Sequence, residues 1–290
     1  MDLIIQSIVI GLTQHAPLVL AALGFALLYR MTGLINVAYA ETITLGAYFA
    51  VWMNTTFGLD FFATLIPAAI LSGLLSVATY LLIFRPAKRR NVGTLEMIII
   101  SFGLSVFLRH ALQFVFGYPS LFFDVPPPER IDVLGVGVNS FRVVALVTVL
   151  ALAGAVYLFI QRTRYGLQAR ALATDESLAQ ASGIRPLTVT AIIWFVAGLA
   201  GGLAGAFWGV GAAVGPALGW EQFLFILLVV LVGGAWGLGG VIAVGIVASI
   251  AMTGMALFSG QVLYAQAGLI IAFMVLLKWR GRRLLEGAKV

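Results

Sequence analysis

The sequence contains no cysteine, which excludes disulfide bonds, thiolate catalysis and cysteine-ligated metal sites. It is also poor in charge: charged residues make up 10% of its 290 residues, against roughly 25% in soluble domains. Hydrophobic residues make up 62% of the chain, and no polar stretch is long enough to enclose a core of its own. We therefore predict that residues 1–290 form a single domain that lies almost entirely in lipid.

Lysine and histidine are also scarce, with three and two residues. The three lysines are Lys88, Lys278 and Lys289, and none follows the glycine-rich pattern of a phosphate-binding loop. The chain is therefore not expected to hydrolyse ATP alone. Its two histidines, His15 and His110, are far apart and lack a second ligand at helical spacing, so no metal site is predicted. A catalytic constellation of serine and histidine or of paired aspartates is also missing, which disfavours an enzyme.

Long apolar segments alternate with short polar connections. A helix needs about 20 apolar residues to cross a bilayer, and backbone groups in lipid must be satisfied within the segment. The sequence predicts an all-α polytopic bundle of about nine spans (8–10). The candidate segments are 3–29, 35–53, 61–83, 95–115, 143–160, 187–210, 220–236, 240–258 and 263–279.

Basic residues gather in the loops on one side of this arrangement. Cationic loops resist translocation, so that side is predicted to be cytoplasmic, with the N-terminus outside and the C-terminus inside. The basic residues assigned to it are Arg30, Arg85, Lys88, Arg89, Arg90, Arg162, Arg164, Arg170, Arg185, Lys278, Arg280, Arg282, Arg283 and Lys289. Topology thus explains the net charge of +6 without a nucleic-acid partner. The long first apolar segment and the absence of a basic start argue against a cleaved signal peptide.

The longest polar stretch occupies residues 161–186, between the fifth and sixth expected spans. Residues 166–173 favour a helix, Thr174 or Asp175 can cap a second short helix over 176–182, and Gly183 suits the left-handed turn that ends it. Two helices this short are not stable alone, so something must receive them. An ordinary loop anchored by arginines at the headgroups is the alternative.

Four stretches, in order along essentially the whole chain, resemble the branched-chain amino acid permeases of the LivH/LivM type, which are ABC importer subunits. They are GLINVAYAETITLGAYFA (33–50), FRPAKRRN (84–91), YGLQARALATDESLAQASGI (165–184) and LVGGAWGLGGVIAVGIV (231–247). One departure is clear: Tyr39-Ala40 stands where the family usually has His-Gly. That departure puts a standard substrate assignment in doubt.

The resemblance implies a type II ABC importer permease in the bacterial inner membrane, with residues 161–186 as its coupling loop. The implied partners are a second homologous permease subunit or a copy of this chain, two cytoplasmic ATPase subunits that carry the ATP, and a periplasmic or extracellular substrate-binding protein. No cofactor is expected on this chain. The residues expected to act in ATPase coupling are Gly166, Arg170, Asp175, Glu176 and Gly183.

A carboxylate at membrane depth, Glu41, points to the translocation pathway. Its cost in lipid is roughly 2.5–3.5 kcal/mol, so it should face protein or water. It either lines the pathway or is a structural group bonded to Asn36 or to another span. Two glycines between short apolar segments suggest a broken helix at the pathway as well. The predicted pathway residues are Asn36, Tyr39, Glu41, Thr44, Gly234 and Gly237.

Other polar and small residues have simpler interpretations. Arg109, near the outer end of the fourth expected span, is expected to extend to the membrane interface. Gly201, Gly205 and Gly209 repeat every four residues and predict close helix packing. The outward loop 116–142, with its three prolines, is either a stiff connector or a contact for the binding protein through Glu129 and Arg130.

Two classes of function remain open at this point. The first is the importer subunit, for branched-chain or other amino acids, or alternatively for urea, short amides or carboxylates. The second is a stand-alone ion-coupled secondary transporter or channel, in which Glu41 would be a proton or sodium site.

Overall fold

The computed structural model describes residues 2–126, 129–234 and 237–287, with side chains described from Leu3 to Lys278 within those ranges. The helices of the first half are α1 (Asp2–Thr32), α2 (Tyr39–Phe57), α3 (Phe61–Thr79), the π-helix η1 (Tyr80–Phe84), α4 (Arg85–Arg89) and α5 (Thr94–Phe116). After a hairpin, β1 (Arg130–Val133) and β2 (Val136–Asn139), come α6 (Ser140–Arg162), α7 (Arg164–Thr174), α8 (Glu176–Ala181), α9 (Pro186–Gly211), α10 (Leu218–Gly233), α11 (Gly237–Ser259) and α12 (Val262–Gly287).

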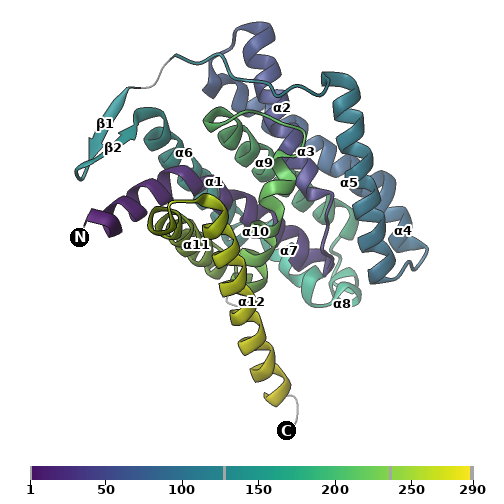
Figure 1. Cartoon of the computed structure of the whole chain (residues 1–290). Coiled ribbons are helices and arrows are strands. Elements are labelled where there is room, and N and C mark those ends of the chain that lie inside the picture. The colour runs from purple at the N-terminus through teal and green to yellow at the C-terminus, as the bar shows by residue number, and fades with distance from the viewer. Residues whose placement is uncertain (1, 127–128, 235–236, 288–290) are drawn as a thin grey trace.

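Polar elements lie at opposite ends of this helical bundle. In Figure 1 the N-terminus and the β1–β2 hairpin lie together at the left, whereas α4, α7 and α8 lie at the lower right. Helix α12 packs on α10 and α11, and its far end projects away from the bundle. The separation of the hairpin from α4, α7 and α8 agrees with the two sides inferred from the charges.

Among the described residues, six helices are long and apolar enough to cross a membrane. They are Leu3–Thr32, Phe61–Arg89, Thr94–Phe116, Ser140–Arg162, Pro186–Gly211 and Gly237–Ser259. Of the other predicted spans, 220–236 and 263–279 correspond to the shorter apolar helices Leu218–Gly233 and Val262–Lys278, and 35–53 corresponds to α2, which carries Glu41 and Asn54. The count of nine spans therefore stays a prediction. The apolar helices are consistent with a helical protein that crosses the membrane several times.

The core forms where α9 packs against α1, α2 and α3. Gly201 and Gly205 on α9 face α2, and a Cβ added at Gly205 would overlap the backbone carbonyl oxygen of Ile43. The glycines therefore let two helix backbones touch, as the four-residue spacing predicts. Gly209 continues this face and lies close to the Ala47 side chain.

The loop between α5 and α6 contains a β-hairpin that the sequence did not predict. Strands β1 and β2 pair antiparallel around a turn in which Leu134 and Gly135 both have positive φ, 56° and 80°. This is the conformation that two-residue hairpin turns require, and the Asp132 carboxylate accepts a hydrogen bond from the Gly135 N–H at 2.7 Å. Of the proline run, Pro127 and Pro128 lie outside the described residues.

The basic tail is described only in part. The backbone of α12 continues to Gly287, but the side chains of Arg280, Arg282 and Arg283 lie outside the described part of the chain, as does the whole of Lys289.

Candidate functional site

The α7–α8 segment (residues 161–186) is fixed to α6 by a tight corner. Thr163 ends α6 and caps α7, with its hydroxyl oxygen accepting a hydrogen bond from the Gly166 N–H at 3.1 Å. A Cβ at Gly166 would overlap the carbonyl oxygen of Ile160. Gly166 is therefore the residue that allows α7 to fold back against the end of α6.

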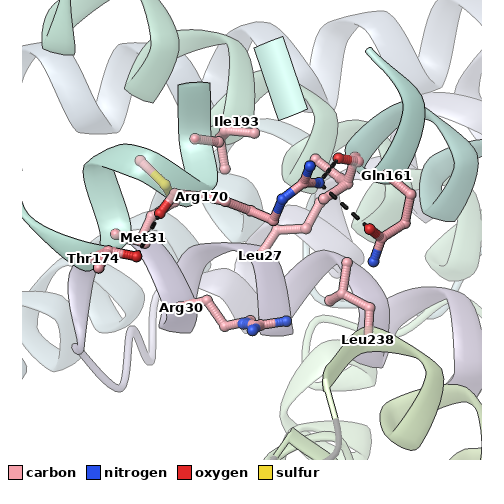
Figure 2. Close-up of a pocket in the computed structure, with 11 residues that line it drawn as sticks. Leu27, Arg30, Met31, Gln161, Arg170, Thr174, Ile193 and Leu238 are labelled. Carbon is pink, nitrogen blue, oxygen red and sulfur yellow. Dashed lines mark hydrogen bonds between the residues drawn. The ribbon is translucent and has the colours of Figure 1, made fainter. Parts of the chain in front are cut away.

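Arg170 strengthens the same corner. Its guanidinium donates to the Ile160 carbonyl at the end of α6 and, at 3.4 Å, to the Gln161 side-chain oxygen. A cation at a helix C-terminus is favourable because the carbonyl end of the helix carries partial negative charge. Figure 2 shows Arg170 reaching from α7 towards Gln161, so its side chain faces its own chain. Its position supports a structural contribution at the base of α7 and not a surface charge for a partner.

Asp175 caps α8; the sequence had offered either Thr174 or Asp175 for this position. Its carboxylate accepts hydrogen bonds from the Ser177 hydroxyl at 2.6 Å and from the Leu178 N–H at 3.0 Å. These two hydrogen bonds hold the pKa of the Asp175 carboxyl below its ordinary value. The neighbouring Thr174 hydroxyl instead donates back to the Arg170 carbonyl at 3.0 Å.

The end of α8 has the predicted left-handed glycine. Gly183 has φ of 84°, and the Ile184 N–H that follows it donates to the Ala179 carbonyl at 3.1 Å. Glu176, in the first turn of α8, forms an ion pair of 2.6 Å with Lys88 of α4. The two short helices are thus held by the caps at Thr163 and Asp175, the hydrogen bonds of Arg170, the turn at Gly183 and the ion pair of Glu176.

Two leucines of this segment remain uncovered. Leu167 on α7 is 61% exposed and Leu178 on α8 is 66% exposed, whereas Ala169, Leu172 and Ala179 are buried. The buried residues attach the segment to the bundle. The two leucines are exposed apolar side chains on α7 and α8, and the backbone N–H of Leu178 is bonded to Asp175.

A second polar region lies inside the bundle, where the first turns of α2 and α10 meet α5. We refer to it as the α2–α5–α10 junction (residues 36–44, Ser105, Arg109, Gly219 and Trp220). Glu41 accepts hydrogen bonds on one carboxylate oxygen, from the Ser105 hydroxyl at 2.9 Å and from the Arg109 guanidinium at 3.1 Å. The indole N–H of Trp220 donates to Ser105 at 2.9 Å, and the Arg109 guanidinium lies 4.8 Å from the Trp220 ring centre. Ser105 sits near the middle of the 23-residue α5, so α2 and α10 both begin level with the middle of a membrane-length helix.

Backbone contacts hold these two helix starts together. The Gly219 N–H donates to the Thr44 hydroxyl oxygen at 3.0 Å, and a Cβ at Gly219 would overlap the Ala40 carbonyl oxygen. Asn36 caps the turn before α2 by accepting from the Ala38 N–H at 3.1 Å. Tyr39 donates its hydroxyl to the Ala21 carbonyl of α1 at 2.9 Å. Helix starts at mid-membrane, facing a charged pair, are typical of transport sites.

The structure separates the predicted pathway residues into two groups. Asn36, Tyr39, Glu41 and Thr44 belong to the junction, but Gly237 begins α11 beside the Arg30 side chain at the end of α1. Gly234 closes α10, and Ala235 and Trp236 between the two glycines lie outside the described residues.

Sequence reasoning missed four members of the junction: Ser105, Arg109, Gly219 and Trp220. The expectation that Arg109 extends to the interface is wrong, because its side chain is only 25% exposed and is paired with Glu41. Glu41 bonds to another helix and not to Asn36. The signal in the sequence was a pair of opposite charges at membrane depth: Glu41 in the apolar segment that forms α2 and Arg109 in the one that forms α5.

Comparisons with known proteins agree with this architecture. The family model described as "Branched-chain amino acid transport system / permease component" matches residues 7–278. The high-affinity branched-chain amino acid transport system permease protein BraD of Pseudomonas aeruginosa is 24% identical over 94% of this chain and 92% of its own length. The corresponding permease protein LivH of Escherichia coli K12 is 26% identical over 85% of this chain and 84% of its own length.

One solved structure is similar in fold. PsaBC from Streptococcus pneumoniae, in complex with a Fab, superposes with a TM-score of 0.50 at 17% identity. The match covers 92% of this chain and 88% of the other. At that identity the similarity concerns the fold alone.

Proposed function

Because the chain belongs to the branched-chain amino acid transport system permease family, we propose that it is the membrane-spanning permease subunit of an ATP-driven ABC importer in the inner membrane. The observation that carries this proposal is the family match over residues 7–278, which includes both the junction and the α7–α8 segment. The chain supplies the route across the membrane, and the energy comes from ATPase subunits on separate polypeptides.

The α7–α8 segment is the proposed docking site for an ATPase. Its exposed leucines Leu167 and Leu178 and its acidic residues Asp175 and Glu176 supply the contact surface. Gly166, Arg170 and Gly183 fix the geometry of the segment relative to α6 and α9. A movement of the docked ATPase would then pass to the ends of two long helices, because the segment connects them directly.

The remaining partners follow from the same family assignment. A second permease subunit, homologous or identical, would cover the outer face of α5, where Ile99 (62%), Phe107 (67%) and Phe114 (92%) are exposed. A second ATPase would dock on that subunit. A binding protein outside the cell would deliver the solute to the end of the bundle that carries the β1–β2 hairpin.

The α2–α5–α10 junction is the proposed part of this chain nearest the translocation pathway. It sits behind the exposed face of α5 and holds Glu41 by a guanidinium. That pairing argues against the rival function of an ion-coupled transporter, because Arg109 already supplies the positive charge that a proton or sodium ion would bring to Glu41. The pair would instead brace the starts of α2 and α10 as the subunits move.

The proposed solute is a branched-chain or other amino acid, with urea, short amides and carboxylates as alternatives. Tyr39 bears on this choice, since its hydroxyl is already bonded to the backbone of α1 and is therefore occupied within the fold. Solute choice would then depend mainly on the binding protein and on shape.

Reconstitution tests the proposal. The chain is placed in liposomes with candidate ATPases, a second permease and a binding protein from the same organism, and uptake of radiolabelled leucine is measured. Uptake is expected to require ATP and an intact ATPase nucleotide site. Uptake by the chain alone, driven by a proton or sodium gradient, would overturn the assignment. Calorimetry of the binding protein with leucine, urea and short carboxylates then identifies the solute.

A further inference from the structure

A cavity of about 320 Å³ lies between the ends of α1, α6 and α7, the side of α9 and the start of α11. Figure 2 shows that Arg30 from α1 and Arg170 from α7 both extend into this space, with Gln161 on one side of it and Leu238 below. It lies beneath the α7–α8 segment, at the end of the bundle where the basic residues gather.

The cavity holds two positive charges and no lining carboxylate. Arg170 is bonded to the end of α6 through one of its nitrogens. The exposed side chain of Arg30 makes no hydrogen bond or ion pair within the described part of the chain, and none of the cavity's lining residues is Asp or Glu. Two guanidinium groups that line one open-sided cavity repel each other, and an anion between them would remove that repulsion.

The start of α11 adds to the positive potential around Arg30. Its Nη1 lies 3.8 Å from where a Cβ of Gly237 would be, at the first residue of α11. A helix start carries partial positive charge. The C-terminal turn of α1, in which Arg30 lies, carries partial negative charge and offsets part of this positive potential.

Apolar side chains, among them Leu27, Ile193 and Leu238, form part of the walls, and Gln161 and Thr174 add polar groups to the lining. Apolar walls lower the local dielectric and strengthen charge-assisted hydrogen bonds. Guanidinium groups match the geometry of phosphate oxygens, and the volume exceeds that of a phosphate group, which leaves room for an attached glycerol.

We propose that this cavity binds a phosphate-bearing anion, supplied by a phospholipid headgroup or by soluble phosphate. The anion joins Arg30 of α1 to Arg170 of α7 and so braces the α7–α8 segment against the bundle. This site is independent of the transported solute, and it links the anion content of the membrane surface to the stability of α7.

Native mass spectrometry of the purified full chain in neutral detergent tests the site. The probes are dioctanoyl phosphatidylglycerol, dioctanoyl phosphatidylcholine and inorganic phosphate at constant ionic strength. The variants are Arg30→Gln and, as the matched control, Arg162→Gln, which removes an exposed arginine nearby that does not line the cavity. Arg30→Gln is expected to weaken binding of the anionic probe about tenfold, because one charge-assisted contact is lost, whereas Arg162→Gln leaves binding unchanged.

A second variant keeps the test decisive if Arg30→Gln folds poorly. Gln161→Glu places a carboxylate beside Arg170 with almost no change of shape, and it should raise the melting temperature without anion while weakening binding of the external probe.

Preference for phosphatidylglycerol over inorganic phosphate identifies a lipid source, and the reverse identifies soluble phosphate. Equal binding by Arg30→Gln and Arg162→Gln, or loss of ATPase association in Arg30→Gln with no anion bound to the wild-type chain, would overturn the proposal.

Discussion

Glu41 and Glu176 occupy similar positions: each is a carboxylate in the first turn of a helix, paired with a basic side chain from another helix. The Glu41 side chain is 1% exposed and its partner Arg109 is 25% exposed. The Glu176 side chain is 43% exposed and its partner Lys88 is 64% exposed. Water screens the second pair and not the first, so a similar contact contributes differently to stability in the two regions.

This difference separates the two regions by function. The junction buries its charges and fixes them, as expected of a part that holds α2 and α10 in place. The α7–α8 segment leaves its charges and two leucines at the surface, as expected of a part that a partner must cover.

Removing Arg109, the half-buried partner of the buried Glu41, should have the largest effect. Arg109→Ala leaves the Glu41 carboxylate buried without its charge partner, which costs about 3–5 kcal/mol, and we expect a large loss of thermal stability of the purified chain. The double variant Arg109→Ala/Glu41→Gln should recover much of that loss, because no charge is left uncompensated. Arg142→Ala, in the first turn of α6, is the control. A stability loss in the double variant as large as in the single one would contradict the interpretation.

Gly166→Ala should separate docking from folding. The added methyl overlaps the Ile160 carbonyl, so α7 must shift, at an expected cost of about 1–3 kcal/mol. ATPase co-purification should fall while the bundle remains folded. Gly154→Ala is the matched control, since a Cβ there meets nothing within 4 Å and alanine favours the helix. If Gly166→Ala retains the ATPase as well as Gly154→Ala does, the corner at Gly166 has no part in docking.

Asp175→Ala should loosen α8 only. Amide exchange in the first turn of α8 is expected to rise about fivefold once the cap is lost, with Thr174→Ala unchanged. The pKa of Asp175 is lowered in the folded chain, so the cap contributes fully above the ordinary value of about 3.9 and is lost as pH falls below it. Protection factors, that is exchange rates divided into the intrinsic base-catalysed rate at each pH, check this direction between pH 6 and pH 3. Weaker protection of the first turn of α8 at the higher pH would contradict it.

Lys88→Gln should have the smallest effect. An exposed ion pair contributes about 0–1 kcal/mol and is weakened by salt, so the variant should match the wild type in 1 M NaCl. A larger loss that persists at high salt would mean that the Lys88–Glu176 pair behaves like the buried pair.

The sequence predicted local features better than distant pairings. The helices of the α7–α8 segment, the cap at Asp175 and the turn at Gly183 depend on neighbouring residues, so short patterns identify them. The pairing of Glu41 with Arg109 joins residues 68 positions apart. It depends on how α2 and α5 pack, which a single apolar segment does not reveal. The hairpin was missed for a related reason: Leu134 adopts a left-handed conformation that its residue type does not suggest.

The absence of cysteine allows the most direct test of the account. Gln180→Cys places a single thiol on the exposed side of α8, and Tyr118→Cys, 76% exposed in the opposite loop, is its counterpart. A membrane-impermeant maleimide should label Gln180→Cys only in inside-out vesicles, and bound ATPase should protect it, whereas Tyr118→Cys should react only from outside. Labelling of Gln180→Cys from the outer face, or equal labelling with and without the ATPase, would contradict the claim that α7–α8 is a cytoplasmic docking site.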